Sequence, residues 1–226
     1  MDASILIPVY NEQEILSESL NRLNKYLDLY GLDCEIIVCS NGSTDGTEDI
    51  GKVLEEKYPK LTFIKTDERG VGWAFRKMVE TAKTNKLVSV DADLTTDMGF
   101  IPQSIKLLDD YDIVVGSKRM GEQNRPLTRI IISKTFIGLV KLLLGLYFGD
   151  YSIGAKAYRK DKITPYTKKI DHGSSYVIEV IYYVKAGNNV IEIPVVCSDS
   201  RGSKFNIIDE ISYRAVNLFR FWWAVK

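Results

Sequence analysis

Hydrophobic residues in the first half of the chain fall into short, unbroken runs that alternate with longer segments of helical periodicity. The runs are rich in β-branched residues and too short for helices, so they predict strands that are buried on both faces. These strands are predicted at residues 3–9, 34–39, 61–65, 86–91 and 112–116. The intervening segments place apolar residues three and four positions apart, and they predict helices at residues 11–31, 47–58, 73–84 and 101–109. The alternation predicts an α/β fold with a single doubly wound, mostly parallel sheet.

The first of these helices carries a capping signature. Asn11 is a favourable N-cap residue, and Glu14 stands three positions later, as in a capping box. We therefore expect this helix to begin at Asn11 and to end near Gly31.

Polar residues gather directly after the predicted strands. Asn11 follows the first strand, residues 40–45 follow the second, and Asp91 and Asp93 end the fourth. In a parallel sheet, ligands bind outside the carboxyl ends of the strands. The sequence thus predicts that these residues share one edge of the sheet and form a binding site there.

Asp91 and Asp93 are candidate metal ligands. Residues two apart on a strand point the same way, so the two carboxylates converge if the backbone stays extended. Two like charges this close repel each other unless a cation lies between them. Mg²⁺ or Mn²⁺ suits such a pair, with substrate phosphates filling the remaining positions. An aspartate-rich turn without a metal is the alternative.

The second half of the chain contains two long apolar segments. Residues 128–149 are about as long as a membrane span, but Lys134 and Lys141 interrupt them, and each would cost roughly 2.5–3.5 kcal/mol at a bilayer centre. Their spacing places both lysines on one helix face, which favours an amphipathic helix at a membrane surface or in a protein groove. A core helix that covers the sheet is the alternative. Residues 207–226 place tryptophans beside cations, which is typical of membrane-interface anchors and also of helices packed on a domain.

Composition narrows the function classes. With 226 residues, 45% of them hydrophobic, the chain is long enough for one buried core. Basic and acidic residues number 30 each, so the net charge is zero and nucleic acid is not an expected partner. Cys34, Cys39 and Cys197 lack metal or redox spacing, which favours reduced thiols in a cytosolic protein. The N-terminal residues do not have the pattern of a signal peptide.

Several motifs together resemble a known enzyme family. They are IPVYNE at 7–12, NGSTDGT at 41–47 and DAD at 91–93, in this order. The chain is similar to inverting family-two glycosyltransferases with the Rossmann-like A-type fold. RIIISK at 129–134, DYSIG at 150–154 and IPV at 193–195 followed by RGSK at 201–204 resemble the dolichyl-phosphate mannose synthase-like branch. The resemblance covers about residues 3–205.

The resemblance and the chemistry of the residues imply a set of roles. Asp93, Arg129 and Arg201 are the expected catalytic residues. Asp91 and Asp93 are the expected ligands of Mg²⁺ or Mn²⁺. The expected donor-binding residues are Pro8, Tyr10, Glu12, Asn41, Asp45, Asp91 and Lys118. The expected acceptor-phosphate residues are Arg129, Ser133, Arg201 and Lys204.

The chain departs from the family pattern at three places. Ser40 and Asn41 stand where the family has aspartates that contact the nucleotide base, so the base identity stays open. Thr95 replaces a glutamine that serves as a further metal ligand, and Thr95, Asp97 or water would have to substitute for it. The Gly-Ser-Arg of the branch appears here as Gly116-Ser117-Lys118-Arg119, so either Lys118 or Arg119 could serve as its cation.

No residue presents itself as an obvious general base. His172 is the only histidine, and its position favours a role at the start of a helix predicted over 174–186. Glu179 on that helix matches a recurrent acid of the family, and a structural carboxylate is the alternative. A lipid phosphate acceptor is already an anion at neutral pH, so it needs cations for positioning rather than a base.

These observations predict a metal-dependent enzyme that transfers a hexose from a GDP- or UDP-linked sugar to polyprenyl (dolichyl) phosphate with inversion. We expect a catalytic domain over 1–205, an amphipathic helix over 206–226, and a peripheral position on the cytoplasmic face of the membrane. One alternative is transfer to a hydroxyl of a saccharide or protein, which would require a general base. The other is a non-catalytic subunit that binds nucleotide sugars.

Overall fold

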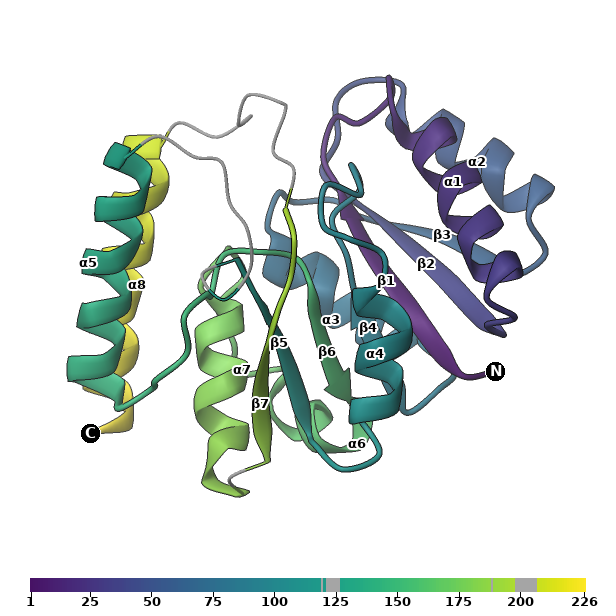
Figure 1. Cartoon of the computed structure of the whole chain (residues 1–226). Coiled ribbons are helices and arrows are strands. Elements are labelled where there is room, and N and C mark those ends of the chain that lie inside the picture. The colour runs from purple at the N-terminus through teal and green to yellow at the C-terminus, as the bar shows by residue number, and fades with distance from the viewer. Residues whose placement is uncertain (119, 121–126, 188, 198–206) are drawn as a thin grey trace.

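The computed structural model describes residues 1–118, 120, 127–187, 189–197 and 207–226, with the backbone alone described for 127–129, 186, 207–209 and 211. In this part of the chain, one sheet of seven strands has the order β3-β2-β1-β4-β6-β5-β7 (Figure 1). The strands are β1 (Ala3–Val9), β2 (Cys34–Asn41), β3 (Leu61–Thr66), β4 (Lys86–Ser89), β5 (Ile113–Ser117), β6 (Lys156–Arg159) and β7 (Val190–Pro194). Among these, β6 runs antiparallel to both of its neighbours, β4 and β5, and the other pairings are parallel. The predicted doubly wound, mostly parallel sheet is confirmed.

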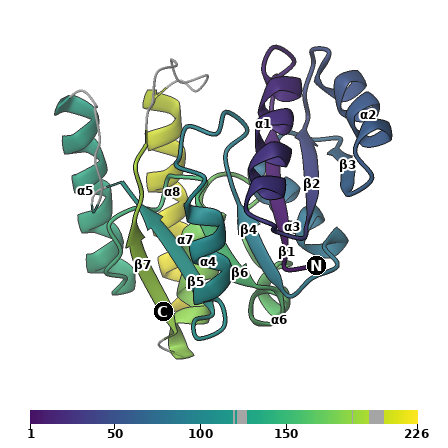
Figure 2. The same ribbon diagram turned by 45° about the vertical axis from the view of Figure 1, so that its right-hand side comes forward.

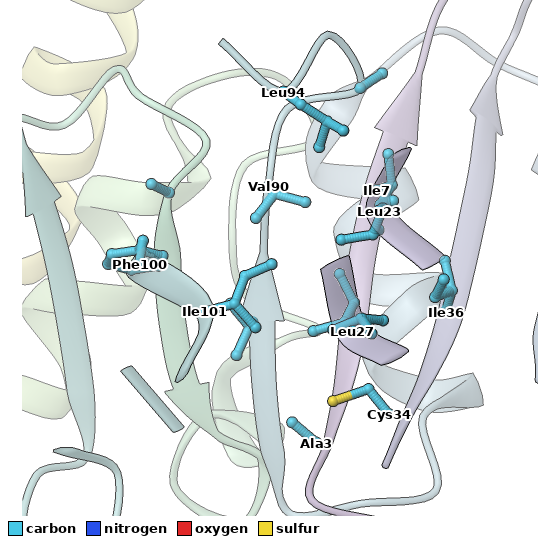
Figure 3. Close-up of a cluster of buried hydrophobic side chains, with 14 of the residues drawn as sticks. Ala3, Ile7, Leu23, Leu27, Cys34, Ile36, Val90, Leu94, Phe100 and Ile101 are labelled. Carbon is cyan, nitrogen blue, oxygen red and sulfur yellow. The ribbon is translucent and has the colours of Figure 1, made fainter. Parts of the chain in front are cut away.

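Helices cover both faces of the sheet. They are α1 (Leu16–Leu29), α2 (Thr47–Lys57), α3 (Val71–Thr81), α4 (Phe100–Leu107), α5 (Leu127–Leu144), α6 (Lys160–Ile163), α7 (Tyr176–Val184) and α8 (Ile207–Val225), with short 3₁₀ turns η1 (Thr164–Tyr166) and η2 (Lys185–Gly187). Apolar residues of α1, α2 and α4 pack on one face, as Figure 3 shows for part of this cluster, and those of α3, α5, α7 and α8 pack on the other. The sheet is therefore the middle layer of three.

Strands β1, β2 and β5 are mostly apolar because both of their faces are buried. Ile5 and Ile7 of β1 belong to the cluster under α1, whereas Leu6 between them belongs to the cluster under α3. Cys34 and Cys39 of β2 likewise lie on opposite faces, as their spacing predicts. Burial raises the pKa of these two thiols to about 11 and about 12, so both stay protonated at neutral pH.

Two predicted helix boundaries are wrong. The first helix begins at Leu16 rather than at Asn11, and its N-cap residue is Ile15, without a side-chain cap. Asn11 has a positive φ of 53°, and its side chain bonds to another loop instead of to the helix. The helix predicted over 128–149 ends at Leu144, because Gly145 adopts φ +62° and donates its N–H to the Lys141 carbonyl at 3.0 Å. A left-handed glycine of this kind commonly terminates a helix.

Helices α5 and α8 contact each other at one side of the sheet, with their first turns at the level of the carboxyl ends of the strands (Figures 1 and 2). Leu218 and Phe221 bury the inner side of α8 against the body of the protein. The Tyr213 hydroxyl donates to the Asp171 carboxylate at 2.8 and 3.0 Å, and Arg214 Nε donates to Ser174 Oγ at 3.2 Å. The C-terminal helix is thus fixed to the loop before α7. No helix in the described ranges has the length and apolarity that a bilayer crossing requires.

Candidate active site at the carboxyl edge of the sheet

The loops after β1 and β2 are hydrogen-bonded to each other. Asn11 Oδ1 accepts the N–H of Thr44 at 2.8 Å, and the Asn11 N–H donates to Ser43 Oγ at 3.1 Å. The Glu12 N–H donates to Thr47 Oγ1 at 2.8 Å. These bonds place the predicted donor residues Tyr10 and Glu12 beside the 41–47 turn, as the strand-end argument predicts.

Asp45 organises this turn from within. Its Oδ1 accepts the N–H of Thr47 at 3.0 Å and the Thr47 hydroxyl at 2.5 Å, and its Oδ2 accepts the Gln13 N–H at 3.3 Å. Burial acts to raise the pKa of Asp45, but the hydrogen bonds from Thr47 and Gln13 outweigh it, so the pKa is lowered. Asp45 therefore stabilises the 41–47 turn with a carboxylate that stays ionised.

Asn41 and Ser40 have different roles. Ser40 is fully buried, and its hydroxyl donates to Glu48 Oε1 at 3.3 Å, so it points into the fold. Asn41 Oδ1 accepts the Gly70 N–H at 2.5 Å and so connects the end of β2 to the start of α3. With Oδ1 bonded to Gly70, the remaining polar group of the Asn41 side chain is Nδ2, which is a hydrogen-bond donor.

The loop before α7 covers the N-terminal end of α3 and bonds to its first amides. The His172 carbonyl accepts the N–H groups of Gly72 at 2.8 Å and Trp73 at 3.2 Å, and the His172 and Trp73 rings stack at 3.7 Å. A side chain at Gly70 would meet the His172 carbonyl at 2.5 Å. The first amides of α3 are therefore satisfied inside the protein, and His172 has a structural role here. The Arg69 guanidinium lies 4.1 Å above the Tyr10 ring, which places a cation over a predicted donor residue.

Asp91 and Asp93 lie in a turn directly after β4. The strand ends at Ser89, and the Leu94 N–H bonds to the Asp91 carbonyl at 3.1 Å, so the backbone does not stay extended through both aspartates. Asp91 Oδ2 accepts the Gly154 N–H at 3.0 Å, and Asp93 Oδ1 accepts the Thr95 N–H at 3.1 Å. Burial raises the pKa of Asp91, and the charge of Asp93 raises it further. The two carboxylates are thus close enough to repel each other.

The carboxylate pair is suited to a hard divalent cation. It offers oxygen ligands in a partly buried turn, and Asp91 uses one oxygen for Gly154. Within the described residues, no three His, Cys, Asp or Glu side chains are grouped closely enough to hold a metal ion. Further ligands would therefore come from substrate phosphates and water, as is usual for Mg²⁺.

Two lysines and a second buried aspartate surround this pair. Lys118, just after β5, and Lys156, at the start of β6, both act electrostatically on Asp91 and on Asp150. Burial acts to raise the pKa of Asp150, but the charges of Lys156 and Lys118 outweigh it and lower the pKa. Lys118 directly follows the end of β5, so this predicted donor residue lies at the same edge of the sheet as the carboxylates.

The acceptor-phosphate residues are only partly placed. Arg129 and Ser133 are one helical turn apart in the first half of α5, and only the backbone of Arg129 is described. Arg201 and Lys204 lie outside the described residues. Their role in binding phosphate stays a prediction.

Glu179 contributes a structural carboxylate. Its Oε2 accepts the N–H of Asp171 at 2.5 Å, and this bond holds the loop that carries His172. Burial raises the pKa of Glu179 to about 7, although the Asp171 N–H opposes the shift. This geometry favours the structural interpretation over the family's acid.

Comparison with known proteins identifies the family. Residues 4–167, most of the chain, match the family described as Glycosyl transferase family 2. The chain belongs to this family. It is 25% identical over its whole length to glycosyltransferase AglD of Haloferax volcanii and 34% identical over 148 residues, 64% of the chain, to the dolichol-phosphate mannosyltransferase of Pyrococcus furiosus. It spans only 38% and 42% of these two relatives. The match to the undecaprenyl-phosphate mannosyltransferase of Micrococcus luteus is 27% identical and covers 84% of the chain and 81% of that relative.

Solved structures confirm the A-type fold. Glucosyl-3-phosphoglycerate synthase of Mycobacterium tuberculosis superposes with a TM-score of 0.70 at 16% identity, over 98% of this family 2 chain and 79% of that one. The mannosyltransferase PcManGT of Pyrobaculum calidifontis, solved with GDP-Man and Mn²⁺, gives a TM-score of 0.57 at 19% identity, over 90% of this chain and 58% of that one.

Some residues of this family 2 site are not apparent from the sequence. Lys156 is fully buried, whereas a lysine in a four-residue strand is ordinarily expected at the surface. The usable signal is its neighbourhood, since Ala155, Ala157 and Tyr158 are all apolar and indicate a central strand. The bonds that connect Asn41 to Gly70 and His172 to Trp73 join distant segments, and spacing along the chain does not predict them.

We expect Gly154→Ala to destabilise the site, because the added Cβ would overlap the Asp91 carboxylate. Overpacking of this kind costs about 1–3 kcal/mol of unfolding free energy. Gly138→Ala is the matched control: it has open space around it in α5, and a glycine-to-alanine change in a helix gains about 0.5–1 kcal/mol. Urea denaturation of both variants measures the difference. Equal stability of the two would contradict the close approach of Gly154 to Asp91.

Glu179→Gln should change how stability depends on pH. A carboxyl whose pKa is raised by folding, here from 4.5 to about 7, stabilises the folded protein below pH 4.5 and loses that contribution as the pH rises through 7. The substituted glutamine would keep an oxygen for the Asp171 N–H without titrating. The variant should therefore gain stability relative to the wild type between pH 5 and pH 8, measured by thermal unfolding. Glu80→Gln is the control, because Glu80 is an exposed carboxylate paired with Arg76. If the stability of Glu179→Gln and of the wild type depends on pH in the same way, the pKa of Glu179 is not raised by folding.

Proposed function

We propose that residues 1–205 form the catalytic domain of a glycosyltransferase that moves a hexose from a nucleotide-diphosphate sugar to a polyprenyl phosphate with inversion. The observation that carries this proposal is the carboxylate pair Asp91/Asp93 in the turn after β4, at the carboxyl edge of a family 2 sheet. The names of the Pyrococcus furiosus and Micrococcus luteus relatives, a dolichol-phosphate and an undecaprenyl-phosphate mannosyltransferase, support a polyprenyl phosphate acceptor.

The donor diphosphate would lie against Asp91, Asp93 and Lys118. Asp93 is the main candidate ligand for Mg²⁺ or Mn²⁺, with Asp91 beside it, and Lys118 is close enough to offset phosphate charge. A bound divalent cation would neutralise the negative charge that develops on the departing nucleotide. The structural neighbour solved with GDP-Man and Mn²⁺ supports this choice of metal and of nucleotide-sugar donor.

The nucleoside would occupy the loops after β1 and β2, near Pro8, Tyr10 and Glu12. Since Asn41 uses its oxygen for Gly70, its Nδ2 would donate to a carbonyl of the base. Uracil and guanine both carry such an acceptor, so GDP- and UDP-linked donors are both compatible. Asp45 would act by shaping the loop, because its oxygens are bonded to Thr47 and Gln13.

The acceptor chemistry favours a phosphate over a hydroxyl. Transfer to a hydroxyl requires a positioned base, and Glu179, a carboxyl with a pKa of about 7, is bonded to the Asp171 N–H and holds a loop. A lipid phosphate would need only cations, which Arg129, Arg201 and Lys204 would supply together with Ser133.

Helices α5 and α8 would bring the enzyme to its lipid acceptor. Val216, Phe219 and Trp223 recur at helical spacing along the exposed side of α8, and Trp223 is 77% exposed. Ile131 and Leu142 are similarly exposed on α5. Exposed cations accompany these apolar residues, namely Lys134, Lys141, Arg220 and Lys226. Apolar side chains with cations around them are typical of helices that lie in an anionic membrane surface, here the cytoplasmic face.

The transfer reaction is tested with radiolabelled GDP- and UDP-hexoses, polyprenyl phosphate and Mg²⁺ or Mn²⁺, by counting product extracted into organic solvent. We expect Asp93→Asn to lose at least about a hundredfold in turnover, because the variant lacks a charged metal ligand. Asp2→Asn is the control, since Asp2 also accepts a backbone N–H but lies at the opposite end of β1. Full turnover in excess chelator would refute the metal, and the absence of lipid-linked product with every donor would refute the proposed reaction.

Membrane contact is tested by flotation with anionic vesicles. Replacing Phe219 and Trp223 by serine should reduce binding at least about tenfold, because burial of large apolar side chains contributes about 1.5–3 kcal/mol each. Leu29→Ser is the matched control, as Leu29 is 78% exposed at the end of α1. If both variants float equally well with the vesicles, the proposed membrane contact is wrong. If the Phe219/Trp223 variant instead loses concentration-dependent dimers and its lipid binding is unchanged, α5 and α8 contact a second copy of the chain.

A further inference from the structure

Lys156 is a fully buried cation in the middle of the sheet. It lies on the antiparallel strand β6, opposite Ser89 of β4 and Val115 of β5, and its exposed fraction is 0%. Its side chain lies on the same face as that of Tyr158, two residues along, under the cluster formed with α3 and α7. Burying an ammonium group is costly unless it is paired and hydrogen-bonded, so a lysine here requires a reason.

The surroundings of Lys156 belong to the candidate active site. Its Nζ donates to the Ile153 carbonyl at 2.8 Å. One residue further, the Gly154 N–H holds the Asp91 carboxylate, and at the start of the same loop Asp150 Oδ1 accepts the N–H groups of Ser152 at 2.8 Å and Ile153 at 3.2 Å. The loop over 150–154 is therefore held between the ammonium and the carboxylate.

The charges around Lys156 are largely negative. Burial lowers its pKa to about 8, and Asp150, Asp91 and Glu192 oppose this shift, while Lys118 adds to it. Glu192 is itself bonded to the Gly149 N–H at 2.6 Å. The Ile153 carbonyl and the Gly154 N–H belong to one peptide group, which bonds to the ammonium on one side and to Asp91 on the other. The positive charge of Lys156 is therefore separated from the Asp91 carboxylate by a single peptide group, and it favours the charged form of that carboxylate.

We propose that Lys156 is a positioning residue and a countercharge of the Asp91/Asp93 site. Lys156 holds Asp91 in place through the Ile153–Gly154 peptide group, and its positive charge opposes the binding of a divalent cation until a nucleotide diphosphate binds. This rests on the proposed function for the identity of the diphosphate. A fixed positive charge near the carboxylates repels a free metal ion, and it attracts the phosphates that accompany a metal-bound donor. The metal and the donor should consequently bind cooperatively.

Lys156→Met removes the charge and keeps a long apolar side chain. Lys160→Met is the matched control, because Lys160 also donates its ammonium to a backbone carbonyl, that of Ala82, in a different part of the protein. Free Mn²⁺ is titrated by electron paramagnetic resonance, without nucleotide and with GDP or UDP. Removing one unit of charge at this range should tighten binding of Mn²⁺ alone at least about tenfold. The enhancement by GDP or UDP should shrink in Lys156→Met and stay unchanged in Lys160→Met.

Unchanged or weaker Mn²⁺ binding by a folded Lys156→Met protein would overturn the proposal. If this variant does not fold, the double variant Lys156→Met/Asp150→Asn decides, because it removes one buried charge of each sign. If Lys156 acts as a countercharge, the double variant should regain the circular dichroism spectrum and the cooperative melting of the wild type. Failure to regain them would refute the proposal. The absence of any transfer activity would instead count against the proposed function. It would leave the present proposal intact, because the binding of Mn²⁺ alone to wild type and variants does not depend on transfer activity.

Discussion

The hydrogen bond between the Gly154 amide and the Asp91 carboxylate joins the two halves of the fold. Asp91 lies in the turn after β4, and Gly154 precedes the antiparallel strand β6 that lies between β4 and β5. Only a glycine allows this approach, because any Cβ would occupy the space of the carboxylate. A buried carboxylate needs donors and an opposite charge, and the second half of the chain supplies both.

This arrangement gives the site fixed charges at a cost to stability. Lys156 and Asp150 are buried and Asp91 is partly buried, and buried charges of opposite sign typically contribute little net stability compared with apolar residues of the same volume. Preorganised charges are useful when a ligand with several negative charges must be oriented without rearranging the protein. The stability that these charges do not supply comes from the large apolar clusters on both sides of the sheet. A functional reason therefore explains the charges of Lys156, Asp150 and Asp91 better than a stabilising role does.

Local patterns in the sequence predict the fold well and the site only in outline. No short apolar run predicts β6 or β7. Strands β1 to β5 follow from short apolar runs, and the shared edge follows from the polar residues after them. The start of α1 does not, because Asn11 bonds to Thr44, which is distant along the chain, instead of capping the helix. Lys156 is missed for a similar reason: its burial depends on strand order, and β6 lies between β4 and β5 although it comes after both in sequence.

The contact of α8 with the loop before α7 has a consequence for biosynthesis. Tyr213 and Arg214 fix residues 171–174, and this loop in turn caps α3 beside Asn41 near the start of the chain. Protein chains fold progressively from the N-terminus as they leave the ribosome. The strands of the first half can pair early, but the loop beside Asn41 is secured only after α8 has emerged. A nascent chain released before α8 is made would therefore contain a sheet whose loop beside Asn41 is not yet held in place, and this loop would be exposed to proteases and chaperones.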